Sequence, residues 1–195
     1  MIKPQTLKGF RDFLPADAIK RQSVIGKIRE VFERFGFDPL ETPALEYAET
    51  LLGKYGNEAD KLLYLFKDNG GRSVGLRYDQ TVPLSRVVAQ YQNELPIPFK
   101  RYQIQPVWRA ENTQKGRFRE FLQCDIDTVG SDSPMSDAEI IDCTLAAFRM
   151  LGFSEVTMLV NDRMLFDTQN LTKQEIIILD KLDKIGKDEV IRLMS

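Results

Sequence analysis

The stretch from Trp108 to Asp127, WRAENTQKGRFREFLQCDID, holds an unusual density of side chains that could bind a charged ligand. Alternate residues of a strand point to the same face. With that period, the even positions from Phe118 to Thr128 are mainly apolar, whereas the odd positions carry arginine, phenylalanine, glutamine and aspartate. Arginine matches phosphate, carboxylates and amides hold an ammonium or imidazole, and an aromatic ring stacks on a base. The mixture favours a ligand that combines an anion, a cation and a ring.

Residues 101–111 also carry mainly polar side chains at odd positions and mainly apolar side chains at even positions. The odd positions here are Arg101, Gln103, Gln105, Arg109 and Glu111, and the even positions are Tyr102, Ile104, Pro106, Trp108 and Ala110. A solvated face of an antiparallel sheet is also polar, so parity alone leaves a plain solvent-facing surface open. We predict strands over residues 99–111 and 117–130, joined by the loop NTQKG in an antiparallel connection.

The N-terminal part is predicted to supply elements that support these strands. Apolar residues at helical spacing predict an amphipathic helix from Asp17 to Phe35. Pro39 and Pro43 cannot donate to a ladder, so their segment reads as an extended edge leading into another helix. Residues 62–66 and 73–79 are predicted to form an antiparallel hairpin, and Thr81 to open a helix.

The C-terminal part predicts further helices and one strand. Ser136 with Glu139 has the pattern of a capping box that opens a helix ending at Gly152. Residues 156–160 are predicted to form a buried strand. Thr172 with Glu175 repeats the capping-box pattern before a charged helical tail broken at Gly186. Strands joined by hairpin loops, with helices before and after, predict an α+β fold built on an antiparallel sheet.

The composition excludes several kinds of catalytic and binding site. The 195 residues include no histidine and only two cysteines, Cys124 and Cys143, which excludes triads based on histidine, a disulfide framework and a cysteine-rich metal site. The net charge of -2 argues against binding nucleic acid through bulk positive charge. No stretch approaches the roughly 18 apolar residues of a membrane span. Residues 1–13 lack the apolar core of a signal peptide, so we expect a cytoplasmic protein without a membrane partner.

Four separated segments resemble the conserved motifs of one family. KRYQIQPVWRAENTQKGRFREFLQCDIDTVG resembles motif 2 of class II aminoacyl-tRNA synthetases, in the version found in histidyl-tRNA synthetases. FGFDPLETPALE, from Phe35 to Glu46, resembles motif 1 of that family. LKGFRDFLP, from Leu7 to Pro15, is similar to its N-terminal signature, and GLRYDQTVPLSR, from Gly75 to Arg86, to its amino-acid loop. The resemblance implies the antiparallel catalytic core of class II synthetases.

The resemblance also implies an ATP site. Arg109 would grip the α-phosphate and act as the catalytic residue, Glu111 would accept from the adenine amino group, and Phe121 would stack on the adenine. Arg117 and Arg119 would meet the outer phosphates. Surface ion pairing offers a plainer interpretation for Arg119. Mg²⁺ is the cofactor implied beside ATP, and no metal-binding residue in the chain is assigned to it.

A histidine site and a dimer interface follow from the same resemblance. Gln123 and Asp127 would hold the histidine substrate, and Asp79 and Thr81 would receive its α-ammonium group. Asp79 could instead serve only as an acidic residue at a helix N-terminus. Pro43 in motif 1 would lie at a homodimer interface, or would merely protect an edge strand.

The implied reaction joins histidine to ATP, releasing pyrophosphate, and then transfers the histidyl group to tRNA-His. After residues 159–163 the family continues into an insertion domain, motif 3 and an anticodon-binding domain, whereas no motif 3 stretch occurs before Ser195. The resemblance thus implies a core truncated before motif 3, with residues 1–163 as the N-terminal part of the catalytic domain. Residues 164–195 would begin the insertion domain. We expect residues 1–195 alone not to complete catalysis.

Two other functions stay open at this point. A regulatory subunit of ATP phosphoribosyltransferase shares this fold without aminoacylation and would make the chain a binding or regulatory module. Such proteins tend to lose the basic residues of the motif 2 loop, whereas Lys115, Arg117 and Arg119 are present here. Another class II synthetase is disfavoured by the combination of RYDQT with FLQCDID.

Overall fold

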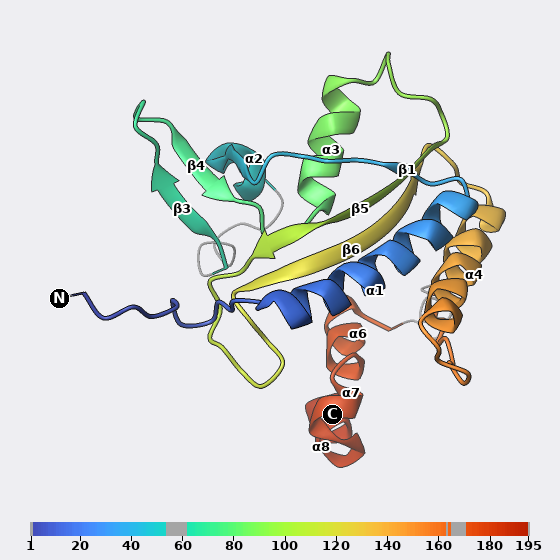
Figure 1. The fold of residues 1–195 in the computed structure, drawn as a ribbon. Coiled ribbons are helices and arrows are strands. Elements are labelled where there is room, and N and C mark those ends of the chain that lie inside the picture. Colours follow the sequence, from blue (N-terminus) through green and yellow to red (C-terminus); the bar gives the residue numbers. More distant parts are fainter. Residues whose placement is uncertain (1, 54–61, 163, 165–170, 195) are drawn as a thin grey trace. The chain divides into compact units, whose positions relative to one another are not determined.

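Two long antiparallel strands, β5 (Phe99–Trp108) and β6 (Glu120–Val129), form the centre of the fold (Figure 1). The short strand β1 (Asp38–Pro39) pairs with β5 in parallel, which gives a sheet in the order β1-β5-β6. The computed structural model describes residues 2–53, 62–162, 164 and 171–194. It divides into two compact units, residues 1–156 and residues 157–195.

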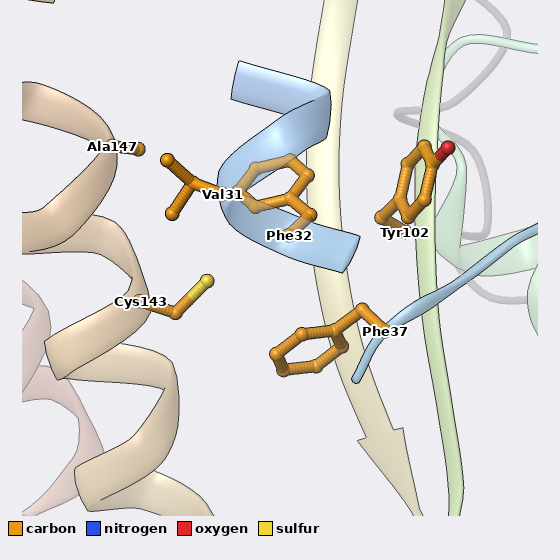
Figure 2. Packing of buried hydrophobic residues seen from close by; sticks show 6 residues of the cluster. All are labelled: Val31, Phe32, Phe37, Tyr102, Cys143 and Ala147. Carbon is orange, nitrogen blue, oxygen red and sulfur yellow. The ribbon is translucent and has the colours of Figure 1, made fainter. Parts of the chain in front are cut away.

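One face of this sheet is covered by two helices, α1 (Pro15–Arg34) and α4 (Pro134–Met150). Figure 2 shows the buried core that these helices form with β5 and the segment after α1, with six residues drawn: Val31, Phe32, Phe37, Tyr102, Cys143 and Ala147. The even-numbered residues Ile104 and Ile126 pack against this cluster. Parity therefore assigned the apolar face correctly, and the odd-numbered side chains point the other way.

A second sheet carries the segments predicted as a hairpin. It has the order β2-β4-β3, with β2 (Leu45–Tyr47), β3 (Tyr64–Lys67) and β4 (Ser73–Leu76) all antiparallel to their neighbours. Helix α2 (Ala48–Leu52) follows β2, and helix α3 (Thr81–Gln90) begins shortly after β4. Leu51, Leu63, Tyr78 and Val82 form the small buried cluster that joins these elements.

The second unit consists of short helices. In order these are α6 (Lys173–Leu179), α7 (Leu182–Ile185) and α8 (Lys187–Met194), and Gly186 separates the last two at a φ of 81°. The capping box of Thr172 and Glu175 is present at the start of α6, as predicted. The predicted boundary between residues 163 and 164 touches residue 163, which lies outside the described residues, and the identity of the second part stays a prediction.

Three sequence predictions need correction. The N-cap of α4 is Ser133, whose hydroxyl accepts from the backbone N–H of Met135, so Ser136 lies inside the helix. Pro134 explains the earlier start, since proline is well suited to the first helical turn. Residues 156–160 form no strand, and Leu159 is 91% exposed, because an apolar run becomes a strand only where a neighbour completes its ladder. The central strands are also shorter than the predicted ranges.

None of the helices in the described part of the chain is both long and apolar enough to cross a membrane.

The buried aromatic residue Phe37 provides a test of the core. It is 1% exposed and packs within the α1 and α4 cluster, so Phe37→Ala removes contacts that the surroundings cannot replace. We expect a loss of about 3 to 5 kcal/mol in the free energy of unfolding, measured by chemical denaturation. Ile19→Ala, on a residue of α1 that is 70% exposed, is the control. A Phe37→Ala loss no larger than that of the control would contradict this core.

Candidate active site

The strand register places the polar residues of β5 and β6 opposite one another on a single face. Four cross-strand pairs share this face, namely Arg101 with Asp127, Gln103 with Asp125, Gln105 with Gln123, and Val107 with Phe121. Side chains directly opposite in an antiparallel pair interact. The face is therefore one continuous surface with a charged end, an amide-rich middle and an aromatic end.

Much of this surface is buried, which excludes the plain solvent-facing interpretation for β5. The side chains of Arg101 and Gln103 are fully buried, and so is Gln80, which lies between β4 and α3. Buried polar groups are stable only when they are hydrogen-bonded. The Gln103 amide donates to Thr42 Oγ1 at 2.8 Å and to Gln105 Oε1 at 2.6 Å. These bonds form a polar layer under the surface.

Arg77 links this layer to the segment that contains Pro43. Its guanidinium donates to the carbonyl oxygens of Thr42 and Pro43, to Gln105 Oε1 at 3.1 Å, and to the carbonyl oxygen of Pro106 at 2.9 Å. Burial lowers the pKa of Arg77, yet an arginine stays protonated in proteins. Its bonds hold the β1–β2 connection against β5.

Gln80 anchors the segment before α3, which was predicted to be the amino-acid loop, to the central strands. The Gln80 amide donates to the carbonyl oxygens of Gln105 at 3.0 Å and Gln123 at 3.3 Å. On one side of it, Asp79 Oδ1 accepts from the backbone N–H of Val82, so Asp79 does serve the N-terminus of α3. On the other side Thr81 is exposed. The anchor places Asp79 and Thr81 beside the strand that carries Gln123.

Gln123 lies in the middle of the face and Asp127 at its charged end. Gln123 donates to Asp125 Oδ2 at 2.8 Å, and its own Oε1 is buried without a hydrogen-bond partner in the described part of the chain. Asp127 Oδ2 lies 2.5 Å from Arg101 Nη2. Burial raises the pKa of Asp127, and the Arg101 guanidinium opposes that rise. This end can offer a carboxylate and an amide oxygen to a donor such as an imidazole or an ammonium.

The near end brings an arginine against an aromatic ring. The Arg109 guanidinium carbon lies 5.0 Å from the centre of the Phe121 ring, and Arg109 Nε donates to the Tyr78 carbonyl oxygen at 3.1 Å. A cation over a ring is attracted to its face. The two residues predicted to contact phosphate and adenine therefore lie together.

The loop between the strands carries the remaining predicted phosphate ligands. Arg117 Nη1 lies 4.0 Å from Glu111 Oε2, and the two side chains are 69% and 40% exposed, so the ion pair is weak and Arg117 can turn to a ligand. Arg119 differs, because its Nε donates to the Glu111 carbonyl oxygen at 3.1 Å and its backbone N–H donates to the Gly9 carbonyl oxygen. Arg119 thus supports the loop.

Residues 9–11, from the predicted N-terminal signature, pack against the residues just before β6. Gly9 has a φ of 91°, and a Cβ there would lie 2.8 Å from Arg119 and from Thr113. Only glycine suits both the positive φ and this contact. Arg11 lies over the Phe118 ring, 3.3 Å from its centre. Residues 9–11 therefore brace the start of β6.

Sequence reasoning missed several residues that build the site. Arg77, Gln80, Arg101 and Gln103 were assigned no role, although the parity pattern had put Arg101 and Gln103 on the polar face. The available signal was their position, because a charged or amide side chain on the middle strand of a sheet requires a buried partner. No alternation marks Gln80 or Arg77, which lie beyond the end of β4.

Pro43 is exposed and borders a surface pocket of about 640 Å³, which is also lined by Leu45, Tyr47, Arg86 and Tyr91. No group of three or more cysteine or acidic residues that could hold a metal ion occurs within the described residues.

Comparison with known proteins identifies the family. The family model described as Histidyl-tRNA synthetase matches residues 9–176. The histidine-tRNA ligase of Treponema denticola is 49% identical over 202 residues, which cover 100% of this chain and 45% of that protein. The crystal structure of histidyl-tRNA synthetase from Nostoc sp. PCC 7120 has a TM-score of 0.81 at 33% identity, and the match covers 97% of this chain and 46% of that one.

A second similar structure carries both functions in its name, the regulatory subunit and the synthetase. It is the ATP phosphoribosyltransferase regulatory subunit/histidyl-tRNA synthetase from Bacillus halodurans C, with a TM-score of 0.69 at 29% identity, covering 80% of this chain and 40% of that one. The regulatory alternative gains no better support than the synthetase. The chain spans a little under half the length of the curated relatives that it matches, 45% of the protein from Treponema denticola and 43% of the histidine-tRNA ligase from Rhodopirellula baltica. Since the family match extends over most of its residues, from the N-terminal signature to α6, this chain belongs to the histidyl-tRNA synthetase family.

Proposed function

We propose that the polar face of β5 and β6 is the ATP- and histidine-binding floor of a histidine-tRNA ligase. The observation that carries the proposal is the register itself. It puts Phe121 at one end of a single surface and Asp127 at the other, with Gln123 between them. Arg109 lies against Phe121, and Gln80 holds Asp79 and Thr81 beside the same surface. A reaction between ATP and an amino acid requires adjacent sites of these two chemistries.

ATP would occupy the aromatic end. Adenine would stack on Phe121 with Glu111 accepting from its amino group, which requires the Arg109 guanidinium to turn from the ring towards the α-phosphate. Arg117 would meet the outer phosphates, since its side chain is exposed and its ion pair is weak. Arg119 is proposed as a second contact, and its bond to the Glu111 carbonyl oxygen uses only Nε.

Histidine would occupy the carboxylate end. Its α-ammonium would face Asp79 and Thr81, and its imidazole would face Gln123 and Asp127. The buried Gln123 Oε1 supports this arrangement, because a buried acceptor without a partner costs free energy that a ligand donor would recover. The histidine carboxylate would then point along the face towards the α-phosphate.

The proposed reaction needs no protein nucleophile. The histidine carboxylate attacks the α-phosphorus of ATP, pyrophosphate leaves, and the ribose hydroxyl of tRNA-His later takes the histidyl group. Positioning and cations placed where charge develops can drive such phosphoryl chemistry. We propose that Mg²⁺ arrives bound to ATP and neutralises phosphate charge, because Mg²⁺ is commonly held by substrate phosphates with few carboxylates.

We also propose that the protein acts in the cytoplasm as a homodimer joined through the segment around Pro43. Leu45 and Tyr47 are 45% and 52% exposed at the rim of the adjoining pocket. Large apolar side chains gathered on a surface mark interaction sites.

Removing the Arg109 guanidinium should slow the first step. In the full-length gene product, Arg109→Ala is expected to lower the rate of histidine-dependent ATP-pyrophosphate exchange by roughly 10² to 10³, the scale for one preorganised donor. Arg29→Ala, at an exposed position on α1 across the sheet, is the control. An unchanged exchange rate in a folded Arg109→Ala protein would exclude this role.

Residues 1–195 expressed alone are expected to show no histidine-dependent ATP-pyrophosphate exchange, because no motif 3 stretch occurs in them. The histidine-tRNA ligase of Treponema denticola, of which this chain covers 45%, provides the comparison when assayed at the same concentration. Measurable exchange by residues 1–195, lost on Arg109→Ala, would show that this part is catalytically complete.

The interface is tested by placing a charge in it. Leu45→Asp in the full-length gene product is expected to shift the sedimentation of a dimer to that of a monomer, because a buried unpaired charge is costly. Ile19→Asp, on exposed α1, should leave the dimer intact. A dimer that survives Leu45→Asp would place the interface elsewhere.

A further inference from the structure

Arg101 is a fully buried arginine for which the proposed reaction has no use. It has no exposed side-chain area, and it stands opposite Asp127 in the register of β5 and β6. Its Nη2 lies 2.5 Å from Asp127 Oδ2, and its Nη1 donates to Gln103 Oε1 at 3.4 Å. Burying a charge costs free energy. The buried guanidinium of Arg101 beside Asp127, which is proposed to bind histidine, therefore needs an explanation.

Among the described residues, the charged groups that act on Arg101 are three carboxylates. Asp127 and Asp125 come from β6, Asp79 from the segment before α3, and Arg101 from β5, and all three carboxylates act on the Arg101 charge. Burial lowers the pKa of Arg101, and the carboxylates oppose this, Asp127 most strongly. Asp125 accepts from the neutral Gln123 amide. Asp127 is thus the carboxylate that Arg101 contacts directly.

Asp127 remains accessible despite this contact. About 35% of its side chain is exposed, compared with none of the Arg101 side chain, so a ligand can reach the carboxylate from the open side of the face. A carboxylate that is already paired attracts a further cation less than an unpaired one does, because the two charges partly cancel. It still accepts a hydrogen bond from a neutral N–H donor.

Resting on the proposed function, we propose that Arg101 is a positioning residue that balances the charge of Asp127 and so makes the site bind histidine with a neutral imidazole ring. Gln103, which is itself bonded to Thr42 and Gln105, holds the other side of the guanidinium. The site thereby recognises a hydrogen-bond donor of the right shape and disfavours the permanently cationic side chains of lysine and arginine.

This proposal fixes the direction of a pH effect. The imidazole of free histidine has a pKa near 6.5, so below that pH histidine must lose a proton before it binds in neutral form. Its affinity for the wild-type protein should then fall about tenfold between pH 7.5 and pH 5.5, with close to one proton released at pH 5.5. Without Arg101, histidine can bind with its imidazole protonated, and the proton is then shared between the imidazole and Asp127. The affinity for histidine then no longer falls at low pH.

The experiment is calorimetric titration of the full-length gene product with L-histidine at pH 7.5, 6.5 and 5.5. Repetition in two buffers of different ionisation enthalpy counts the protons released. For Arg101→Gln we expect the affinity to change by less than about threefold across this range, since binding no longer requires deprotonation. Arg101→Lys keeps the charge and should restore the wild-type pH dependence.

Lys100→Gln is the matched control. Lys100 is the neighbouring residue on the opposite face of β5 and pairs with Glu139 of α4 at 2.7 Å, so its loss should lower stability without changing the pH dependence. A merely structural role for Arg101 would make Arg101→Gln behave in the same way.

The outcomes separate the two proposals. If the wild-type protein shows no histidine binding and no histidine-dependent exchange, the proposed function fails. If it binds histidine without releasing a proton at pH 5.5, the inference about Arg101 is overturned even where Arg101→Gln does not fold. If Arg101→Gln folds and keeps the wild-type pH dependence, the inference is overturned as well. The inference about Arg101 is supported if the wild-type protein releases a proton on binding histidine at pH 5.5, Arg101→Gln abolishes this release, and Arg101→Lys restores it.

Discussion

The structure depends on a layer of hydrogen bonds buried between β5 and the segments that cross it. Arg77, Gln103 and Gln105 join the β1–β2 connection to the strand, and Gln80 joins the amino-acid loop to both central strands. Each of these groups would be costly to bury alone. Because these side chains donate to one another and to backbone carbonyl oxygens, the segments that carry Asp79, Thr81 and Pro43 have one position relative to the polar face.

The two faces of the same strands are stabilised by different physics. The even face is held by non-directional packing of Phe32, Phe37 and Tyr102, which sets the position of α1 and α4 but leaves side-chain identity partly exchangeable. The odd face is held by directional bonds that specify partners. Directional hydrogen bonds suit a site that binds charges at fixed distances, because they orient each group before the ligand arrives.

Much of this arrangement could be predicted from the sequence. Alternation within residues 99–111 and 117–130 indicated two strands with one mainly apolar and one mainly polar face, and the motif resemblance indicated the family and the fold. Periodicity could not show that Arg101 and Gln103 are buried, because burial depends on segments distant in sequence, such as the one that carries Thr42. The capping-box pattern at Ser136 was misleading since Ser133 with Pro134 caps the helix earlier, and residues 156–160 lacked a partner strand. Thus local chemistry predicted the elements, while pairing between distant segments decided the interior of the site.

The central claim is that one polar face binds both substrates. It is tested most directly by a crystal structure of the full-length gene product with L-histidine and a non-hydrolysable ATP analogue. We expect the imidazole within hydrogen-bond distance of Gln123 and Asp127, the adenine against Phe121, and Arg109 in contact with the α-phosphate. Density for either ligand elsewhere, with the face between Phe121 and Asp127 empty, would contradict the account.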